Sequence, residues 1–259
     1  MMTASDSSPQ KIALITGANR GLGKEMARSL AAQGTDIVLT YRQNADEAAA
    51  VVAELQATGR RALAVRLDMN DLASYDTFAT GLLAQLKTDW HADGFDYLVL
   101  NAGHGGGVPF AQVTEAFFDE MLNVHYKGVF FLTQRLAPHL RDGGAIVTIS
   151  SGTTRFVNPG YAVYAPLKGA VEVLTRYLAK EFGGRGIRVN CVAPGPIETD
   201  FNGGAIRSNP ELSARLGTMT ALGRVGQADD LGGIVAFLCS DAGRWVNGQR
   251  IEVSGGINL

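Results

Sequence analysis

The sequence predicts an α/β fold in which helices cover both faces of a doubly wound, parallel sheet. Short apolar runs rich in β-branched residues alternate along the chain with longer segments that have helical apolar spacing. The short runs are continuously apolar, which is typical of strands buried on both faces of a sheet. Short links that contain glycine join the segments, so right-handed crossovers would place the strands parallel to one another.

The elements follow one another in a regular order. The expected strands are Lys11–Thr16, Asp36–Tyr41, Ala62–Leu67, Asp96–Leu100, Ala145–Ser150, Ile187–Val192 and Arg250–Val253. The clearest helical segments are Leu22–Gln33, Ala45–Thr58, Leu72–Lys87 and Val163–Phe182. No linker rich in proline or serine divides the 259 residues, and no repeat period is visible. We therefore expect one domain over residues 11–259, preceded by a flexible N-terminus at residues 1–10.

The segment Glu198–Leu222 interrupts this order. It shows no clear strand, and it contains Gly203, Gly204 and Pro210 among scattered apolar residues. A long irregular segment in a compact domain is either disordered or a functional lid. Its position after a strand and its apolar content favour a substrate lid at about residues 198–222.

The composition excludes several classes of protein. The net charge of −2 argues against a nucleic-acid or anionic-membrane surface as the main partner. Cys191 and Cys239 both lie in apolar runs, where we interpret them as buried thiols of a reducing compartment. Residues 1–10 do not resemble a signal peptide, and no apolar stretch approaches the roughly 20 residues that span a bilayer. We expect a cytoplasmic protein with no metal site, no nucleic-acid partner and no membrane partner.

The first expected strand leads into a glycine-rich turn with the pattern Gly17-x-x-x-Gly21-x-Gly23. Glycines permit a tight turn, let backbone N–H groups approach a pyrophosphate and let the following helix pack closely on the strand. The N-terminus of that helix would face the phosphates. Lys24 is followed by Glu25 instead of Ser or Thr, which excludes a P-loop. A turn that merely packs the helix on the strand is the alternative interpretation.

The end of the second expected strand bears on the choice of cofactor. A protein that binds the free 2′-hydroxyl of NAD places an acidic residue there. Here the strand ends Thr40-Tyr41-Arg42 without a carboxylate, and Arg20 lies in the glycine-rich turn. Two guanidinium groups suit a ribose 2′-phosphate, which favours NADP(H) over NAD(H). The alternative is that Arg42 is only a solvated loop cation.

Tyr164 and Lys168 stand four residues apart at the start of an expected helix and therefore share one face. An ammonium group beside a phenol favours the phenolate and lowers the tyrosine pKa from about 10. Such a tyrosine can exchange a proton with a carbonyl–alcohol pair. Pro166 confines the pair to the first helical turn, near the sheet edge where ligands bind in open α/β folds. The two residues alone are also compatible with an ordinary surface helix.

Taken in order, these motifs resemble the short-chain dehydrogenase/reductase family over residues 11–259. The matching segments are Thr16–Gly23, Asp68, Asn101–Gly103, Asn123, Ser151, Tyr164, Lys168, Pro194–Thr199, Gly223–Gly226, Asn247–Gln249 and Gly255–Gly256. The resemblance implies a Rossmann-type, three-layer fold with a seven-stranded sheet in the order 3-2-1-4-5-6-7. Within the family, the pattern is most like 3-oxoacyl-acyl-carrier-protein reductases. Leu100 and Ser254 depart from the usual residues, and Trp90–Gly94 is slightly extended, but no catalytic atom is lost.

The resemblance also implies the roles of individual residues. Asn123, Ser151, Tyr164 and Lys168 match the catalytic tetrad, and the spacing to Tyr164 selects Ser151 over Ser150. Hydride would pass between the nicotinamide and the substrate carbon, while Tyr164 exchanges the proton and Ser151 binds the carbonyl oxygen. Lys168 would lower the tyrosine pKa and bind the nicotinamide ribose, and Asn123 would hold a water that links Lys168 to solvent. A local bond to the backbone is the alternative role for Asn123.

Two sets of residues complete the expected site. The cofactor would contact Gly17, Asn19, Arg20, Gly21, Leu22, Gly23, Thr40, Tyr41, Arg42, Asp68, Met69, Asn101, Ala102, Gly103, Tyr164, Lys168, Pro194, Gly195, Ile197 and Thr199. The substrate would contact His104, Ser151, Phe156, Asn158, Tyr161, Phe201, Ile206 and Met219. His104 is interpreted as a wall of the substrate pocket, with an additional catalytic role as the alternative.

The resemblance predicts an NAD(P)-dependent oxidoreductase, specifically an NADPH-dependent carbonyl (ketone) reductase or alcohol dehydrogenase. Its partners would be a small-molecule carbonyl or alcohol and further copies of the chain, in a homotetramer or homodimer. The alternatives are an NAD-linked alcohol dehydrogenase of the same family and a non-catalytic NADP(H)-binding sensor or structural protein. An acyl-carrier-protein partner would require cations near the site entrance; Arg185 is a candidate, whereas Asp142 and the net charge of −2 oppose it.

Overall fold

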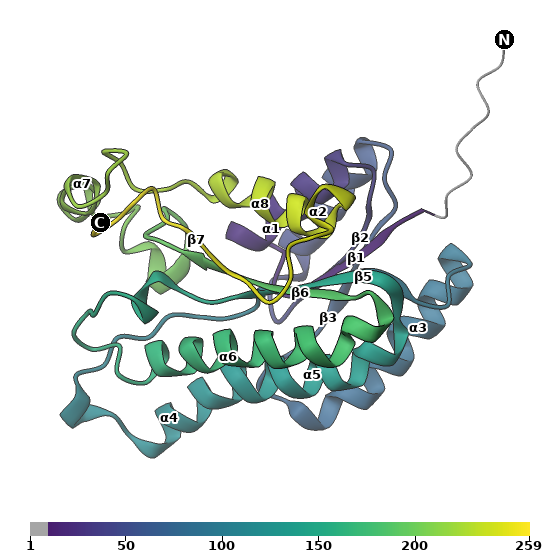
Figure 1. Cartoon of the computed structure of the whole chain (residues 1–259), viewed down its shortest axis with the longest axis horizontal. Coiled ribbons are helices and arrows are strands. Elements are labelled where there is room, and N and C mark those ends of the chain that lie inside the picture. Colours follow the sequence, from purple (N-terminus) through teal and green to yellow (C-terminus); the bar gives the residue numbers. More distant parts are fainter. Residues whose placement is uncertain (1–9) are drawn as a thin grey trace, which may run out of the picture.

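A computed structural model describes residues 10–259, so the flexible N-terminus expected at residues 1–10 lies outside the described residues apart from Gln10. A parallel sheet with the order β3-β2-β1-β4-β5-β6-β7 forms the centre of the fold (Figure 1). Its strands are β1 (Ile12–Ile15), β2 (Asp36–Tyr41), β3 (Ala62–Arg66), β4 (Phe95–Leu100), β5 (Leu140–Ile149), β6 (Arg188–Pro194) and β7 (Arg250–Val253). This order confirms the predicted doubly wound fold class.

Helices cover both faces of the sheet. They are α1 (Gly21–Ala32), α2 (Ala45–Ala57), α3 (Tyr75–Trp90), α4 (Glu115–Leu122), α5 (Gly128–Leu136), α6 (Tyr164–Phe182), α7 (Pro210–Thr218) and α8 (Gly232–Cys239). In Figure 1, α1, α2 and α8 lie above the sheet, α3 to α6 lie below it, and α7 lies apart from both groups near the C-terminus. Within residues 10–259, no helix combines the length and the apolar character that crossing a membrane would need.

Alternate side chains of the strands enter two separate apolar cores. In β1, Ile12 and Leu14 belong to the core that contains residues of α3, α5 and α6, whereas Ala13 and Ile15 belong to the core that contains residues of α1, α2 and α8. All four side chains of β1 and all six of β4 are buried. The continuously apolar runs of the sequence are explained by this double burial.

Two strand boundaries differ from the expected ones. β5 begins at Leu140 rather than Ala145, because Leu140 pairs with Phe95 ahead of a shift in register. β6 extends to Pro194, which pairs in register with Val253 of β7. In both cases the boundary is set by pairing with a neighbouring strand, which local sequence does not specify.

The segment Glu198–Leu222 is not irregular throughout, contrary to the expectation. Pro210 to Thr218 form α7, with Pro210 in its first turn. The Asn209 side chain caps this helix by accepting a hydrogen bond from the backbone N–H of Leu212 at 3.0 Å. An asparagine cap followed by proline is a helix-start signal, so the sequence did carry the information for α7.

Candidate active site

Hydrogen bonds fasten the glycine-rich turn after β1 to the segment after β4. The backbone N–H groups of Asn101 and Ala102 donate to Oγ1 of Thr16 at 3.0 and 2.9 Å. The side-chain amide of Asn101 donates to the carbonyl oxygens of Thr16 and Gly17 at 2.9 and 3.0 Å. Two segments predicted to bind the cofactor therefore form one unit at the carboxyl edge of the sheet.

Glycines in this unit stand where any side chain would collide with backbone. Gly17 has a φ of +65°, and a Cβ atom there would lie 2.9 Å from the Cα atom of Ala102. A Cβ atom on Gly23 would overlap the carbonyl oxygen of Gly17 and would lie 2.6 Å from Nδ2 of Asn101. The backbone can adopt this close turn only because these positions lack side chains.

The first turn of α1 is available to an anion. Arg20 is the N-cap residue, but no side chain caps the helix, and its first turn contains no acidic residue. Thr199, which follows β6, lies 3.8 Å from the Cβ position of Gly21 and closes the crevice on that side. Backbone N–H groups and the positive end of the helix dipole bind phosphate groups at such a terminus. The residues present therefore fit the pyrophosphate of a dinucleotide.

The end of β2 lies beside the same turn and presents cations. Oγ1 of Thr40 accepts a hydrogen bond from the backbone N–H of Gly17 at 3.2 Å. Arg20 and Arg42 are both exposed, and the carbonyl oxygen of Arg42 accepts a hydrogen bond from Nε of Arg66 at 3.3 Å. Arg66 therefore adds a third guanidinium group near the expected position of the 2′-phosphate. The sequence pattern did not indicate this residue. The cluster fits a phosphorylated ribose.

The ends of β3 and β6 carry further predicted cofactor residues. Asp68 folds back on the chain, since its Oδ1 accepts a hydrogen bond from the backbone N–H of Asn70 at 2.9 Å. The backbone N–H of Gly195 donates to the carbonyl oxygen of Val253 at 3.0 Å, and a Cβ atom on Gly195 would lie 2.8 Å from Cα of Ser254. The remaining predicted contacts are buried or half-buried, apart from the exposed Gly103; they are Asn19, Leu22, Tyr41, Met69, Gly103, Pro194 and Ile197.

Ser151, Tyr164 and Lys168 come together where β5 ends and α6 begins. Tyr164 is the first residue of α6 and is only 6% exposed. Nζ of Lys168 lies 5.5 Å from the centre of the Tyr164 ring and donates to the carbonyl oxygen of Ile149 at 2.9 Å. The Ser151 hydroxyl, directly after β5, interacts with the phenol. The structure thus brings together three of the four residues predicted to be catalytic.

The hydroxyl group of Ser151 is oriented to donate a hydrogen bond. Its oxygen already accepts hydrogen bonds from the backbone N–H and from Oγ1 of Thr153, at 3.2 and 3.0 Å. With both acceptor positions occupied, only the proton remains for a further partner. The hydroxyl of the adjacent Ser150 is buried and donates to Oε1 of Glu172 at 2.7 Å. Ser151, and not Ser150, therefore directs its proton into the site, where the Tyr164 hydroxyl is its partner.

The acid–base state of Tyr164 differs from the expected one. The sequence predicts that Lys168 lowers the pKa of Tyr164, but burial raises this pKa above its ordinary value, and only hydrogen bonding with Ser151 opposes the rise. Burial also lowers the pKa of Lys168 to about 8, and its ammonium is bound to the carbonyl of Ile149. Desolvation is the largest cause of both shifts. Tyr164 is therefore a protonated phenol near neutral pH.

A π-helical turn, Asn123–Lys127, joins α4 to α5 next to Tyr164. Asn123, the first residue of the turn, is half-buried, and its side chain makes no hydrogen bond within residues 10–259. The side chain that contacts Tyr164 from this turn is His125, whose ring lies edge-on with the two centroids 5.2 Å apart. The sequence did not indicate His125, because the direction of its side chain depends on the π turn and no local pattern predicts such a turn.

Aromatic side chains lie next to Tyr164 at the predicted substrate pocket. The ring centroids of Tyr161 and Phe201 lie 5.9 and 6.2 Å from that of Tyr164. Asn202, which has a left-handed φ of 54°, donates from Nδ2 to the Tyr161 hydroxyl at 2.9 Å. A Cβ atom on Gly105 would collide with Asn202, so this segment is seated on the loop after β4. Asn202 is a third residue, after Arg66 and His125, that the sequence pattern did not indicate.

The other predicted pocket residues divide into two groups. Phe156 packs on Gly152 beside Ser151, where a Cβ atom would lie 2.6 Å from its ring. His104 lies in the loop after β4, with its Nε2 atom 3.4 Å from Oε1 of Glu120. Of the three other predicted residues, Asn158 and Met219 are exposed and Ile206 is half-buried.

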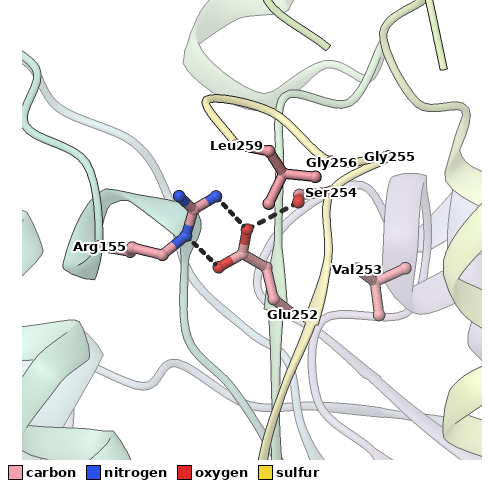
Figure 2. A pocket seen from close by; sticks show the side chains of 7 residues that line it. All are labelled: Arg155, Glu252, Val253, Ser254, Gly255, Gly256 and Leu259. Carbon is pink, nitrogen blue, oxygen red and sulfur yellow. Dashed lines mark hydrogen bonds and ion pairs between the residues drawn. The ribbon is translucent and has the colours of Figure 1, made fainter. Parts of the chain in front are cut away.

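A hollow of about 550 Å³ near the C-terminus is separate from this site (Figure 2). Arg155 crosses it and binds both carboxylate oxygens of Glu252, at 2.8 and 2.6 Å, and Ser254 donates to the same carboxylate at 2.7 Å. The lining includes neither Tyr164 nor Ser151. The ion pair fills the hollow with neutralised charge, so we do not assign the substrate to it.

Arg185 does not lie at the site entrance, contrary to the expectation. It stands just before β6, at the edge of the sheet opposite the site. Its Nε atom donates to Oδ1 of Asp142 at 2.7 Å, and its Nη1 atom donates to the carbonyl oxygen of Ala137 at 2.8 Å. The role of Arg185 is to fix the start of β5, and it offers no charge to a partner bound over Tyr164.

Known proteins share this fold and much of the sequence. The family described as Enoyl-(Acyl carrier protein) reductase matches residues 17–258. A hydroxynaphthalene reductase-like protein of Metarhizium brunneum is 36% identical over 270 residues, covering 98% of this chain and 99% of that protein. The solved angucycline C-6 ketoreductase LanV with bound NADP has 36% identity and a TM-score of 0.91, covering 96% of each chain. A short-chain dehydrogenase/reductase from Serratia marcescens has 32% identity and a TM-score of 0.88, covering 97% of this chain and 99% of the other.

Proposed function

Because the chain belongs to the short-chain dehydrogenase/reductase family, and is thus an NAD(P)-dependent oxidoreductase of carbonyl or alcohol groups, we propose that it reduces small aromatic ketones with NADPH. One observation carries the proposal. Ser151, Tyr164 and Lys168 meet at the carboxyl edge of the sheet, and the rings of Tyr161 and Phe201 lie against Tyr164. A proton donor thus faces an aromatic binding surface.

NADP(H) is the cofactor that the residues fit. The glycine-rich turn and the uncapped α1 N-terminus suit a pyrophosphate, and the exposed Arg20 and Arg42 suit a 2′-phosphate. When bound, NADPH supplies the hydride. Lys168, whose ammonium lies beside the Tyr164 ring, is the residue we assign to the nicotinamide ribose.

The side chains of the site perform the proton chemistry of the reduction. Tyr164 gives its phenolic proton to the carbonyl oxygen, and its raised pKa keeps the proton on the phenol until the oxygen gains negative charge. Ser151 donates a hydrogen bond to the same oxygen, because Thr153 occupies its acceptor positions. The ammonium of Lys168 stabilises the phenolate that the transfer leaves behind. The predicted role of Asn123, binding a water that resupplies the proton, stays a prediction.

We assign a free aromatic ketone rather than an acyl chain carried by an acidic protein. The rings of Phe156, Tyr161 and Phe201 offer flat apolar walls near the reactive hydroxyls. An acidic carrier protein would need free cations around the entrance. Arg155 and Arg207, which adjoin the predicted pocket residues Phe156 and Ile206 in the chain, are instead paired with carboxylates of Glu252 and Asp200. The segment Phe201–Gly204 is the part of the expected lid that we place over the substrate.

The outer face of α5 and α6 supports the expected homotetramer or homodimer. Phe130 and Phe131 on α5 are each 39% exposed, and Val173 and Tyr177 on α6 are 43% and 68% exposed. Exposed apolar side chains on neighbouring helices are typical of a protein interface. Light scattering should therefore give the mass of two or four chains. The mass of a single chain would contradict this assignment.

A reducing, cytoplasmic location fits the two cysteines. Cys191 and Cys239 are both buried free thiols. Burial raises the pKa of each thiol, so neither has thiolate character near neutral pH. Localisation of a fluorescently tagged chain in its source cells tests this assignment, and export to an oxidising compartment would contradict it.

The absorbance of NADPH and NADH in the presence of different carbonyl compounds tests the proposed function. Bicyclic aromatic ketones should oxidise NADPH faster than an acetoacetyl thioester of pantetheine, and NADH should be the poorer reductant. Faster turnover with NADH would favour the NAD-linked alternative. Tight NADPH binding without turnover on ketones, quinones or thioesters would favour the non-catalytic alternative.

A further inference from the structure

One carboxylate oxygen binds both ends of the short segment Ser150–Thr154, called here the serine segment, which contains Ser151. Oε1 of Glu172 accepts a hydrogen bond from the hydroxyl of Ser150 at 2.7 Å and another from the hydroxyl of Thr154 at 2.8 Å. The Glu172 side chain is only 14% exposed, so water competes little for these bonds. The ends of the serine segment are therefore held at one point.

The hydrogen bonds inside the serine segment pass this restraint on to Ser151. The hydroxyl of Thr154 lies 2.9 Å from the carbonyl oxygen of Ser151, and the backbone N–H of Thr154 donates to the same carbonyl at 3.2 Å. The hydroxyl oxygen of Ser151 accepts from the backbone N–H and from Oγ1 of Thr153. The backbone and the side chain of Ser151 are thus both fixed relative to the ends of the segment.

Glu172 lies on the helix that also carries Tyr164 and Lys168. The three residues are four positions apart in α6, so their side chains share one face of the helix. An α-helix rises by about 1.5 Å per residue, and its hydrogen-bonded backbone keeps such spacings constant. The serine segment is therefore attached to the same rigid element as the proposed acid. This attachment fixes Ser151 relative to the Tyr164 phenol that it contacts.

Arg250 of β7 completes the arrangement and neutralises its charge. Its Nε atom donates to Oε1 of Glu172 at 2.8 Å, and its Nη2 atom donates to Oγ1 of Thr154 at 3.1 Å. Its Nη1 atom donates to Glu252 at 3.0 Å, and the Glu252 carboxylate also binds Arg155, as Figure 2 shows. Acidic and basic groups alternate, so the largely buried carboxylate of Glu172 is paired and hydrogen-bonded.

We propose that Glu172 is a positioning residue, which holds the Ser151 hydroxyl where it can bind the same substrate oxygen as the Tyr164 hydroxyl. The catalytic part of this role rests on the proposed reductase function. Two groups that act on one oxygen must be held in a narrow range of positions, and small displacements are costly to the rate. A single oxygen can serve three donors here because a carboxylate accepts several hydrogen bonds.

Four variants separate this role from packing. Glu172→Leu removes the acceptor but leaves Arg250 bound to Glu252, and Glu172→Gln keeps an oxygen in the same place. Thr154→Val removes one of the two attachments, and it serves as the second test should Glu172→Leu disturb folding. Glu181→Leu, at an exposed position of α6, is the matched control for the loss of a carboxylate.

Hydrogen–deuterium exchange of the ligand-free protein, followed by mass spectrometry, tests the attachment without catalysis. The backbone N–H groups of residues 153–155 all donate within the turn that follows Ser151. Peptides that contain them should exchange about tenfold faster in Glu172→Leu, and at nearly the wild-type rate in Glu172→Gln and Glu181→Leu. Unchanged exchange in a folded Glu172→Leu protein, or an equal rise throughout α6, would overturn the proposal.

A double-mutant cycle with Ser151→Ala tests whether Glu172 acts through Ser151. Glu172→Leu alone should lower kcat for ketone reduction by about 10- to 30-fold, and Thr154→Val by about threefold, with the KM for NADPH unchanged. In the Ser151→Ala background, either change should alter kcat by less than about twofold, because the group that it positions is already absent. Glu172→Gln should recover most of the lost kcat.

The cycle distinguishes positioning from a general loss of structure. A loss by the same factor in both backgrounds, or an equal loss in Glu172→Gln, would overturn the role assigned to Glu172. Faster exchange in Glu172→Leu together with an inactive wild-type protein would refute the proposed function and retain the attachment of the serine segment. An active wild-type protein with independent losses in the cycle would do the reverse.

Discussion

The cofactor half and the substrate half of the crevice are built in different ways. On the cofactor side, the site consists mainly of backbone groups. Asn101 is hydrogen-bonded to Thr16, and glycines occupy positions where a Cβ atom would collide with neighbouring atoms. On the substrate side, side chains from separate segments meet, as when Asn202 donates to Tyr161. A backbone-built site leaves short, fixed motifs in the sequence. A site built from side chains depends on how distant segments pack, so no short sequence motif identifies it.

Gly23→Ala should produce the largest loss, and it tests the cofactor half. The new Cβ atom would overlap the Gly17 carbonyl oxygen and crowd Nδ2 of Asn101, so we expect NADPH binding, measured by fluorescence titration, to be abolished. Gly81→Ala is the matched control, because a Cβ atom in that position of α3 meets no atom within 4 Å. The control should raise the free energy of unfolding by about 0.5–1 kcal/mol. Normal NADPH binding by Gly23→Ala would show that the turn tolerates a side chain at this position, contrary to the account.

Ser151→Ala tests the point where the two halves meet. Loss of the donor to the carbonyl oxygen should lower kcat by about 10²–10³-fold, while the KM for NADPH changes little. Ser150→Ala should cost much less, because that hydroxyl is bound to Glu172. Steady-state kinetics of both variants would decide between the neighbours. Equal losses would mean that the orientation inferred for Ser151 is wrong.

Arg42→Ala tests the contribution of a single charge in the cofactor half of the crevice. Removing a guanidinium from the 2′-phosphate should reduce the kcat/KM preference for NADPH over NADH by about 10- to 100-fold. Arg60→Ala, whose side chain binds the carbonyl of Gly34 at 2.9 Å, serves as the control and should keep the preference. A preference unchanged by Arg42→Ala would assign the phosphate to Arg20 and Arg66.

Asn202→Gly should have the smallest effect and tests the substrate half. Glycine tolerates the left-handed backbone at this position, so the change removes the hydrogen bond to Tyr161 and the contact with Gly105 without straining the backbone. We expect the KM for an aromatic ketone to rise about fivefold with kcat nearly unchanged. A large fall in kcat with an unchanged KM would place Asn202 in the chemistry and not in substrate binding.

The fold and half of the site could be predicted because they depend on local pattern. Continuous apolar runs predicted the buried strands, the spacing of Tyr164 and Lys168 placed this pair at the sheet edge, and the family resemblance added Ser151. The direction of His125 could not be predicted, because a π turn and an α turn give the residue different faces. The Tyr164 pKa also escaped prediction, since the degree of burial follows from packing.

The central claim is that Tyr164 is the proton donor for ketone reduction, and Tyr164→Phe tests it most directly. The substitution keeps the ring that contacts His125 and Phe201 and removes only the hydroxyl. NADPH oxidation by an aromatic ketone should slow by about 10²–10⁴-fold, while the Kd for NADPH stays at the wild-type value. Turnover within a few-fold of wild type would contradict the account.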